Sequence, residues 1–129
     1  MCFKTIISIV VLVFSTQYVF SQKKQPENTK LRHVVLFKFK DTSSTDDIHR
    51  IEKAFSALPE KIKEIKGYEW GINNSPENIA QGFTHCFFLT FDSESDRDIY
   101  LPHPDHKVFG ALLGPHLEKV LVLDYWAKN

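Results

Sequence analysis

The sequence has few cysteines and no excess of charge of either sign. Among its 129 residues there are two cysteines, Cys2 and Cys86, and 16 basic residues are balanced by 16 acidic ones. Two cysteines do not make the disulfide framework of a small secreted scaffold, so a hydrophobic core or a partner subunit must hold the fold. The balanced charge argues against a protein that binds nucleic acid through a basic surface.

Long apolar runs are also absent, except near the N-terminus. There, Lys4 precedes an apolar run from Thr5 to Phe14. This run is shorter than a membrane span requires. Together with the compact residues before Ser21, it predicts a secretory signal peptide over residues 1–21, and an uncleaved anchor is the alternative. We therefore expect a secreted or periplasmic protein with no stable membrane association after cleavage.

Cleavage after Ser21 would remove Cys2 and leave 108 residues, with 15 basic residues against 16 acidic ones. Residues 22–30 are polar and include Pro26, which predicts a short tether. Residues 31–129 are long enough for one domain with a modest core.

The apolar periodicity of this domain alternates between that of strands and that of helices. Ser44 is a good cap for a helix that should continue to about Ile65 and bend or break near Pro59. The remaining patterns predict strands over 31–40, 67–73, 82–91 and 119–126 and helices over about 95–100 and 104–113, interrupted at Gly114-Pro115. The order β-α-β-β-α-β predicts an α+β, ferredoxin-like protomer, whose helices cover one face of a four-stranded antiparallel sheet.

The two faces of this sheet should differ in their partners. His33 and His85 each head an aromatic row on the face toward the helices, on the first and third strands, which are central neighbours in this topology. The opposite face is also largely apolar: it carries Val34, Leu36, Cys86 and Phe88. An exposed patch of this kind usually marks an interface, so we expect a homodimer that joins its sheets into a barrel.

The segment Tyr100-Leu-Pro-His-Pro-Asp-His106 is typical of a functional site, because it places a phenol and two imidazoles at a break between two helices. Pro102 disfavours helical geometry at Leu101, so one helix should end there, and His103 and Pro104 should begin the next. His106 would then lie in the first turn of the second helix. Imidazole can act as a base near neutral pH. The alternative is a polar helix start without chemical function.

His33, His85, Tyr100 and His106 are therefore expected to converge on one aromatic-lined cavity between the sheet and the helices. The alternative is that each buried ring is hydrogen-bonded and does nothing else. We expect no metal, since His33 and His85 have no obvious carboxylate or cysteine partner and Cys86 faces the other way. No serine occupies a recognisable nucleophile turn.

Several stretches together resemble the stress-responsive dimeric α/β-barrel (Dabb) domain family. They are Leu31–Lys40, Gly71–Glu77, Gly82–His85, Tyr100–His106 and Leu121–Tyr125. The resemblance covers about Leu31 to Tyr125 and implies a ferredoxin-like protomer paired into a barrel dimer. The family includes a plant polyketide cyclase, in which a histidine and a tyrosine of the matching segment assist an intramolecular aldol condensation. We expect that any such activity of this chain needs no cofactor.

The matching positions here are His106 and Tyr100. By resemblance, His106 would remove a proton next to a carbonyl and Tyr100 would donate a hydrogen bond to the developing oxyanion. His33, His85, His103 and Phe109 would contact the substrate. Phe83 stands where that cyclase has a tyrosine.

Three functions remain open from the sequence. The first is an exported lyase, isomerase or cyclase that acts on a small apolar carbonyl compound. The second is a binding or stress-protection dimer that holds a small apolar ligand without reaction. The third is a monooxygenase for quinol-like substrates or haem, as in related dimeric barrels.

Overall fold

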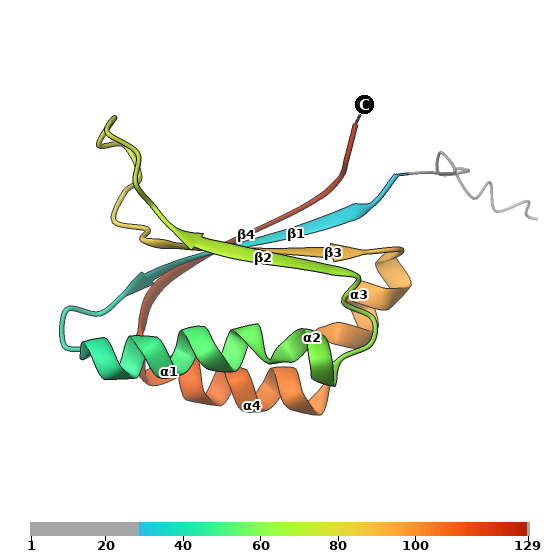
Figure 1. Ribbon diagram of the computed structural model, residues 1–129, viewed down its shortest axis with the longest axis horizontal. Helices are drawn as coiled ribbons and strands as arrows, with labels where there is room; N and C mark the ends of the chain where they lie inside the picture. Colours follow the sequence, from blue (N-terminus) through green and yellow to red (C-terminus); the bar gives the residue numbers. More distant parts are fainter. Residues whose placement is uncertain (1–28, 129) are drawn as a thin grey trace, which may run out of the picture.

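The computed structural model describes residues 29–128, in which a single sheet is covered on one side by helices (Figure 1). The elements in chain order are β1 (Leu31–Phe39), α1 (Thr45–Ser56), α2 (Leu58–Lys61), β2 (Gly67–Ile72), β3 (His85–Phe91), α3 (Glu94–Tyr100), α4 (Pro104–Leu113), the 3-10 turn η1 (Gly114–His116) and β4 (Leu117–Trp126). The predicted signal peptide and residues 22–28 of the predicted tether lie outside the described residues.

The sheet has the strand order β2-β3-β1-β4, and every neighbouring pair is antiparallel. The prediction of an α+β, ferredoxin-like protomer with β1 and β3 at the centre is therefore confirmed. Helices α1 and α4 lie side by side beneath the sheet, and α3 lies near one end (Figure 1).

The core fills the space between the sheet and the helices. Every second residue of β1 from Leu31 to Phe39 is buried, in agreement with the predicted strand period. Phe55 of α1 stacks on Phe87 of β3 with ring centroids 4.1 Å apart, and neither ring is more than 1% exposed. Burial of this aromatic area is the main stabilising contribution that the fold offers.

Helix α1 begins at its predicted cap, but the predicted long helix ends earlier than expected. Ser44 forms a capping box with Asp47 at the start of α1, as the sequence predicts. The predicted long helix is broken at Ala57, and α2 with Pro59 in its first turn ends at Lys61. Ile62 and Ile65 are buried although they lie beyond the helix, so their spacing reflected burial and not helical structure.

The third strand begins later than predicted. β3 starts at His85 because Gln81 and Gly82 both have positive φ angles, of 54° and 82°, and form a turn instead of extended chain. Phe83 therefore lies before the strand, and its backbone N–H donates to the Ala80 carbonyl.

The open face of the sheet is apolar and is not covered within the protomer. Leu121, Leu123 and Tyr125 of β4 are all more than a third exposed. Their cross-strand partners on β1 include Leu36 and Val34, which are half-buried. Within residues 29–128 no helix combines the length and apolar character needed to cross a bilayer.

Candidate functional site

A pocket of about 310 Å³ opens between the helices and the β4 side of the sheet. Its polar groups are His33, Tyr100, His106 and Asp124. Its walls are apolar and come from β1, β4, α1 and α4: they include Val35, Phe37, Phe55, Phe109, Leu113, Leu117, Val120 and Val122. A few convergent polar groups in an apolar pocket are typical of a small-molecule site.

Tyr100, the last residue of α3, is one of the residues that line this pocket. Its side chain is 1% exposed and packs against Phe91 and His33. Burial, with a smaller contribution from Tyr68, raises the pKa of the Tyr100 phenol well above its usual range. The hydroxyl therefore stays protonated at physiological pH and is a hydrogen-bond donor.

The Tyr100 hydroxyl retains accessible surface. Within residues 29–128, Tyr100 takes part in no side-chain hydrogen bond, and no fully buried side-chain oxygen or nitrogen lacks a partner. Because Tyr100 lines the pocket, we expect its hydroxyl to donate to a molecule bound there.

His106 lies in the first turn of α4, as predicted, with its ring centroid 4.3 Å from that of Tyr100. Its Nδ1 lies 2.8 Å from the backbone oxygen of Leu101. Because a carbonyl only accepts, Nδ1 carries the hydrogen, and in the neutral ring Nε2 is left with the lone pair. Nε2 is thus the nitrogen that can take a proton from a substrate.

Leu101 differs from the expectation in one respect. α3 ends at Tyr100 as predicted, but Leu101 keeps helical angles, φ −57° and ψ −47°, although Pro102 follows it. The residue before a proline disfavours this region. Here the Leu101 N–H still donates to Arg97 and its carbonyl accepts from His106, and these bonds offset the preference.

His33 is held at the pocket by a carboxylate that the sequence reasoning did not identify. Its Nδ1 donates to Oδ1 of Asp124 over 2.6 Å, and Arg97 lies 3.6 Å from the other carboxylate oxygen. Asp124 stands directly opposite His33 on β4. Asp124 lies in the stretch Leu121–Tyr125 that carries part of the family resemblance, but the sequence alone does not set the register of β4 and so does not predict its pairing with His33.

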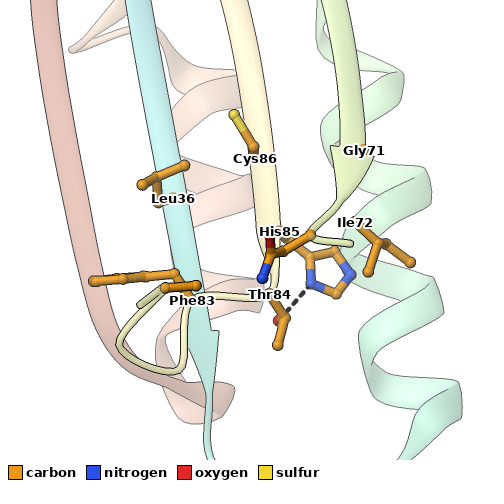
Figure 2. Close-up of a pocket in the computed structure, with 9 residues that line it drawn as sticks. Leu36, Gly71, Ile72, Phe83, Thr84, His85 and Cys86 are labelled. Atoms are coloured by element: carbon orange, nitrogen blue, oxygen red, sulfur yellow. Dashed lines mark hydrogen bonds between the residues drawn. The ribbon is translucent and has the colours of Figure 1, made fainter. Parts of the chain in front are cut away.

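His85 does not join this pocket, so the predicted convergence holds for His33, Tyr100 and His106 but is wrong for His85. β1 and β3 are antiparallel, and the first residues of the two strands therefore lie at opposite ends of the pair. His33 pairs with Leu89, whereas His85 pairs with Phe37, four residues away, or about 13 Å along the strand. His85 instead contacts Glu52. It also contacts Thr84, and Figure 2 shows that bond.

The other two predicted residues have different positions. Phe109 lies one turn beyond His106 and lines the pocket. His103 is not among the lining residues: it caps α4, where its Nδ1 accepts from the Asp105 N–H over 3.2 Å. In the part of the chain that the structure describes, no group of three or more His, Cys, Asp or Glu side chains could hold a metal ion.

Comparison with known proteins identifies the family of this chain. Residues 31–127 match the family model described as "Stress responsive A/B Barrel Domain". The chain is 39% identical over 95 residues to the stress-response A/B barrel domain-containing protein HS1 of Arabidopsis thaliana, which covers 74% of this chain and 87% of that protein. It is 30% identical over 95 residues to olivetolic acid cyclase of Cannabis sativa, across 74% of this chain and 94% of the enzyme.

Solved structures agree with this relationship. Hydroxynitrile lyase from Passiflora edulis superposes with a TM-score of 0.73 at 31% identity, over 77% of this chain and 94% of that chain. A dimeric ferredoxin-like protein of unknown function from Thermobifida fusca superposes with a TM-score of 0.67 at 27% identity, over 78% and 93% of the two chains. From its sequence and its fold, the chain belongs to the stress responsive A/B barrel domain family.

Proposed function

We propose that this protein is an acid–base lyase or cyclase for a small apolar carbonyl compound, with His106 as the base and Tyr100 as the hydrogen-bond donor to the substrate oxygen. The observation that carries the proposal is the bond from His106 Nδ1 to the Leu101 carbonyl. It directs the basic lone pair to Nε2 of a ring whose centroid lies 4.3 Å from that of Tyr100, a phenol whose pKa is raised by burial. A base and a donor of this kind are the minimum set for removing a proton next to a carbonyl.

Two relatives, olivetolic acid cyclase and hydroxynitrile lyase, have names that describe reactions compatible with a histidine base and a tyrosine donor. In a cyclase reaction, the base would take a proton from carbon and the phenol would stabilise the enolate oxygen. In cleavage of a hydroxynitrile, the base would take the hydroxyl proton, the bond to the nitrile carbon would break to release cyanide, and the phenol would hold the oxygen that becomes the carbonyl. Cyanide would then take the proton from the base and leave as hydrogen cyanide.

The pocket also sets limits on the substrate. Its volume of about 310 Å³ is at the lower end of the range for small-molecule sites. Its walls are hydrocarbon and aromatic on both the sheet and the helix side, so the body of the ligand should be apolar. Asp124 disfavours a negatively charged group near His33.

Turnover of a hydroxynitrile tests the proposal directly. Racemic mandelonitrile would be mixed with the protein and release of benzaldehyde followed by absorbance, with wild-type protein compared with His106→Gln and with Lys107→Gln. Lys107 is an exposed neighbour on α4 and is the matched control. Loss of release in His106→Gln alone supports the assignment; equal release in all three proteins contradicts it.

Binding without reaction has its own readout. A ligand that binds to the native state must stabilise it, so it raises the melting temperature. If benzaldehyde and related carbonyl compounds do this but mandelonitrile is not turned over, the protein is a ligand-binding dimer instead. Oxygen uptake with a quinol would indicate the monooxygenase alternative. No described feature favours that third function.

We further propose that two copies pair through the open face of the sheet. The face carries Val34, Leu36, Cys86, Phe88, Leu121 and Leu123, all apolar or nearly so. Solved relatives with the same fold are described as dimeric. Contact between two such faces would bury apolar surface that a soluble monomer rarely exposes.

We also propose that the protein is exported. This proposal is based on the signal-peptide pattern of residues 1–21, which lie outside the described residues. N-terminal sequencing of the protein recovered outside the cytoplasm should begin at Gln22. A chain that starts at Met1 in the cytoplasmic fraction would contradict it.

A further inference from the structure

A second pocket, of about 300 Å³, lies at the end of β2 and β3 where the chain leaves the sheet (Figure 2). It is separate from the pocket of His106, with which it shares no lining residue. It is lined by Leu36, Gly71, Ile72, Asn73, Ala80, Phe83, Thr84, His85 and Cys86. Three consecutive residues, Thr84 to Cys86, supply its hydroxyl, imidazole and thiol groups.

His85 connects a hydroxyl to a carboxylate at this pocket. Its Nε2 lies 2.9 Å from Oε1 of Glu52, and its Nδ1 lies 2.8 Å from Oγ1 of Thr84. Because a carboxylate only accepts, Nε2 carries the hydrogen, so in the neutral ring the Thr84 hydroxyl donates to the lone pair on Nδ1. Figure 2 shows the bond between Thr84 and the ring.

The imidazole is held rigidly in this orientation. The His85 ring stacks on Trp70, with 5° between the two planes, and meets Phe39 edge-on at 90° with centroids 5.0 Å apart. His85 is 6% exposed, whereas Thr84 is exposed. A buried base, oriented by a carboxylate and bonded to an accessible hydroxyl, is the arrangement that activates a nucleophile.

Asn73 is the candidate donor for a developing oxyanion. It lines the same pocket, and its side-chain Oδ1 accepts from the Ser75 N–H over 3.1 Å. This bond fixes the amide so that the two hydrogens on Nδ2 remain available as donors. Leu36, Ile72 and Phe83 give the pocket an apolar wall for a short acyl or alkyl group.

We propose that Thr84, His85 and Glu52 form a second catalytic site that accepts acyl groups from small esters. Thr84 Oγ1 would attack the ester carbonyl while its proton moves to His85 Nδ1. The bond from carbon to the leaving oxygen then breaks, and that oxygen takes the proton from Nδ1. Water, activated by the same nitrogen, would hydrolyse the acyl-threonine, which releases the acid and restores the hydroxyl.

The proposed dimer leaves this site open. Leu36 and Cys86 lie on the open face of the sheet, so a second copy would form one wall of the pocket. Ile72 is the last residue of β2, and Asn73 and Thr84 lie outside the strands; all three are exposed in the protomer. We therefore expect a small ester to reach Thr84 in the dimer as well.

p-Nitrophenyl acetate, mixed with the full-length chain, is the probe that tests the site. Nitrophenolate release should fall at least about tenfold in Thr84→Val and in Glu52→Gln, because general base catalysis contributes at least that much. Thr84→Ser should keep the activity, since it retains the hydroxyl. Thr42→Val, which alters an exposed threonine in a turn away from the pocket, is the matched control and should release nitrophenolate at the wild-type rate.

Acid quenching at early times followed by peptide mass spectrometry locates the acyl group. Acetyl on Thr84, or release that depends on Thr84 with deacylation too fast to trap, supports the site. Release that Thr84→Val does not slow, or acetyl groups found only on lysine or on other histidines, overturns it. Thr84→Ser separates loss of the nucleophile from any effect of the substitution on folding.

Discussion

His33 and Asp124 face each other across β1 and β4, and Nδ1 of the histidine lies 2.6 Å from a carboxylate oxygen of the aspartate. The pair joins β1, at the centre of the sheet, to β4, at its edge, and both residues line the pocket. Arg97 on α3 lies 3.6 Å from the second carboxylate oxygen, so a helix is tied to the same point. The charge of Asp124 thereby fixes one ring nitrogen of His33 as a donor and leaves Nε2 as an acceptor.

Replacing Asp124 by Asn should lower the free energy of unfolding by about 1 kcal/mol, because a charge-assisted hydrogen bond to a buried ring becomes a neutral one. Asp98→Asn is the matched control, since Asp98 also pairs with Arg97 but its side chain is 64% exposed. That change should cost less than about 0.5 kcal/mol. Urea unfolding at pH 7 compares the two, and equal effects would show that the His33 bond does not contribute.

Tyr100→Phe should separate stability from function. The hydroxyl bonds to no described residue, so its removal leaves no protein group unpaired, and the free energy of unfolding should change by less than about 1 kcal/mol. Turnover should fall roughly a hundredfold, because a donor to the substrate oxygen is lost. Tyr68→Phe is the control: it breaks a 3.0 Å bond to Ser56 outside the pocket and should affect stability alone. Full activity of Tyr100→Phe would remove the phenol from the mechanism.

The sequence predicted the fold well because burial dictates its periodicity. The two-residue period of β1 and the cap at Ser44 are local signals, and both elements formed where they were expected. The late start of β3 was not predicted, because the positive φ angle of Gln81 has no clear sequence signature. The spacing of Ile62 and Ile65 indicated burial correctly but not the end of α2.

The site was predicted less completely, because it depends on register. His106, Tyr100 and Phe109 lie on one short segment, and their proximity follows from helix geometry alone. The separation of His33 from His85 and the pairing of His33 with Asp124 depend on how antiparallel strands align. Glu52 is the partner of His85 through a contact between α1 and β3 that is remote in sequence.

Phe87→Ala should be among the most destabilising single substitutions in the chain. Phe87 is fully buried in the centre of the sheet and stacks on both Phe55 and Trp70. Removal of the ring should lower the free energy of unfolding by about 3–5 kcal/mol, from lost burial and from the cavity that remains. Val108→Ala, at a side chain that is 70% exposed, should change it by less than about 0.5 kcal/mol. Guanidinium unfolding would measure both, and similar values would contradict the central place of Phe87 in the core.

The Asp47 carboxyl in the cap of α1 should make the stability of the protein depend on pH. Hydrogen bonds from the Ser44 hydroxyl and backbone N–H, together with Arg50, lower the pKa of Asp47 from 3.8 to about 2. A carboxyl whose pKa is lowered on folding stabilises the protein above its unfolded pKa, and this contribution is lost as the pH falls through the folded value. Asp47→Asn should therefore lower the melting temperature at pH 7, and the difference from wild type should vanish as the pH falls from about 4 to about 2. Asp46→Asn in the same turn is the control, and an Asp47→Asn effect that is independent of pH would contradict this origin.

Leu123→Asp should dissociate the proposed dimer without unfolding the protomer. Leu123 is 54% exposed on the open face of the sheet and pairs with Val34, so a carboxylate there would be tolerated in a monomer but buried and unpaired between two copies. Light scattering after size exclusion should give the mass of a dimer for wild type and of a monomer for the variant, with circular dichroism unchanged. Val108→Asp introduces the same charge on α4, in the helical layer, and should leave the dimer intact. If Leu123→Asp remains dimeric while Val108→Asp dissociates, the helical layer and not the open sheet face forms the interface.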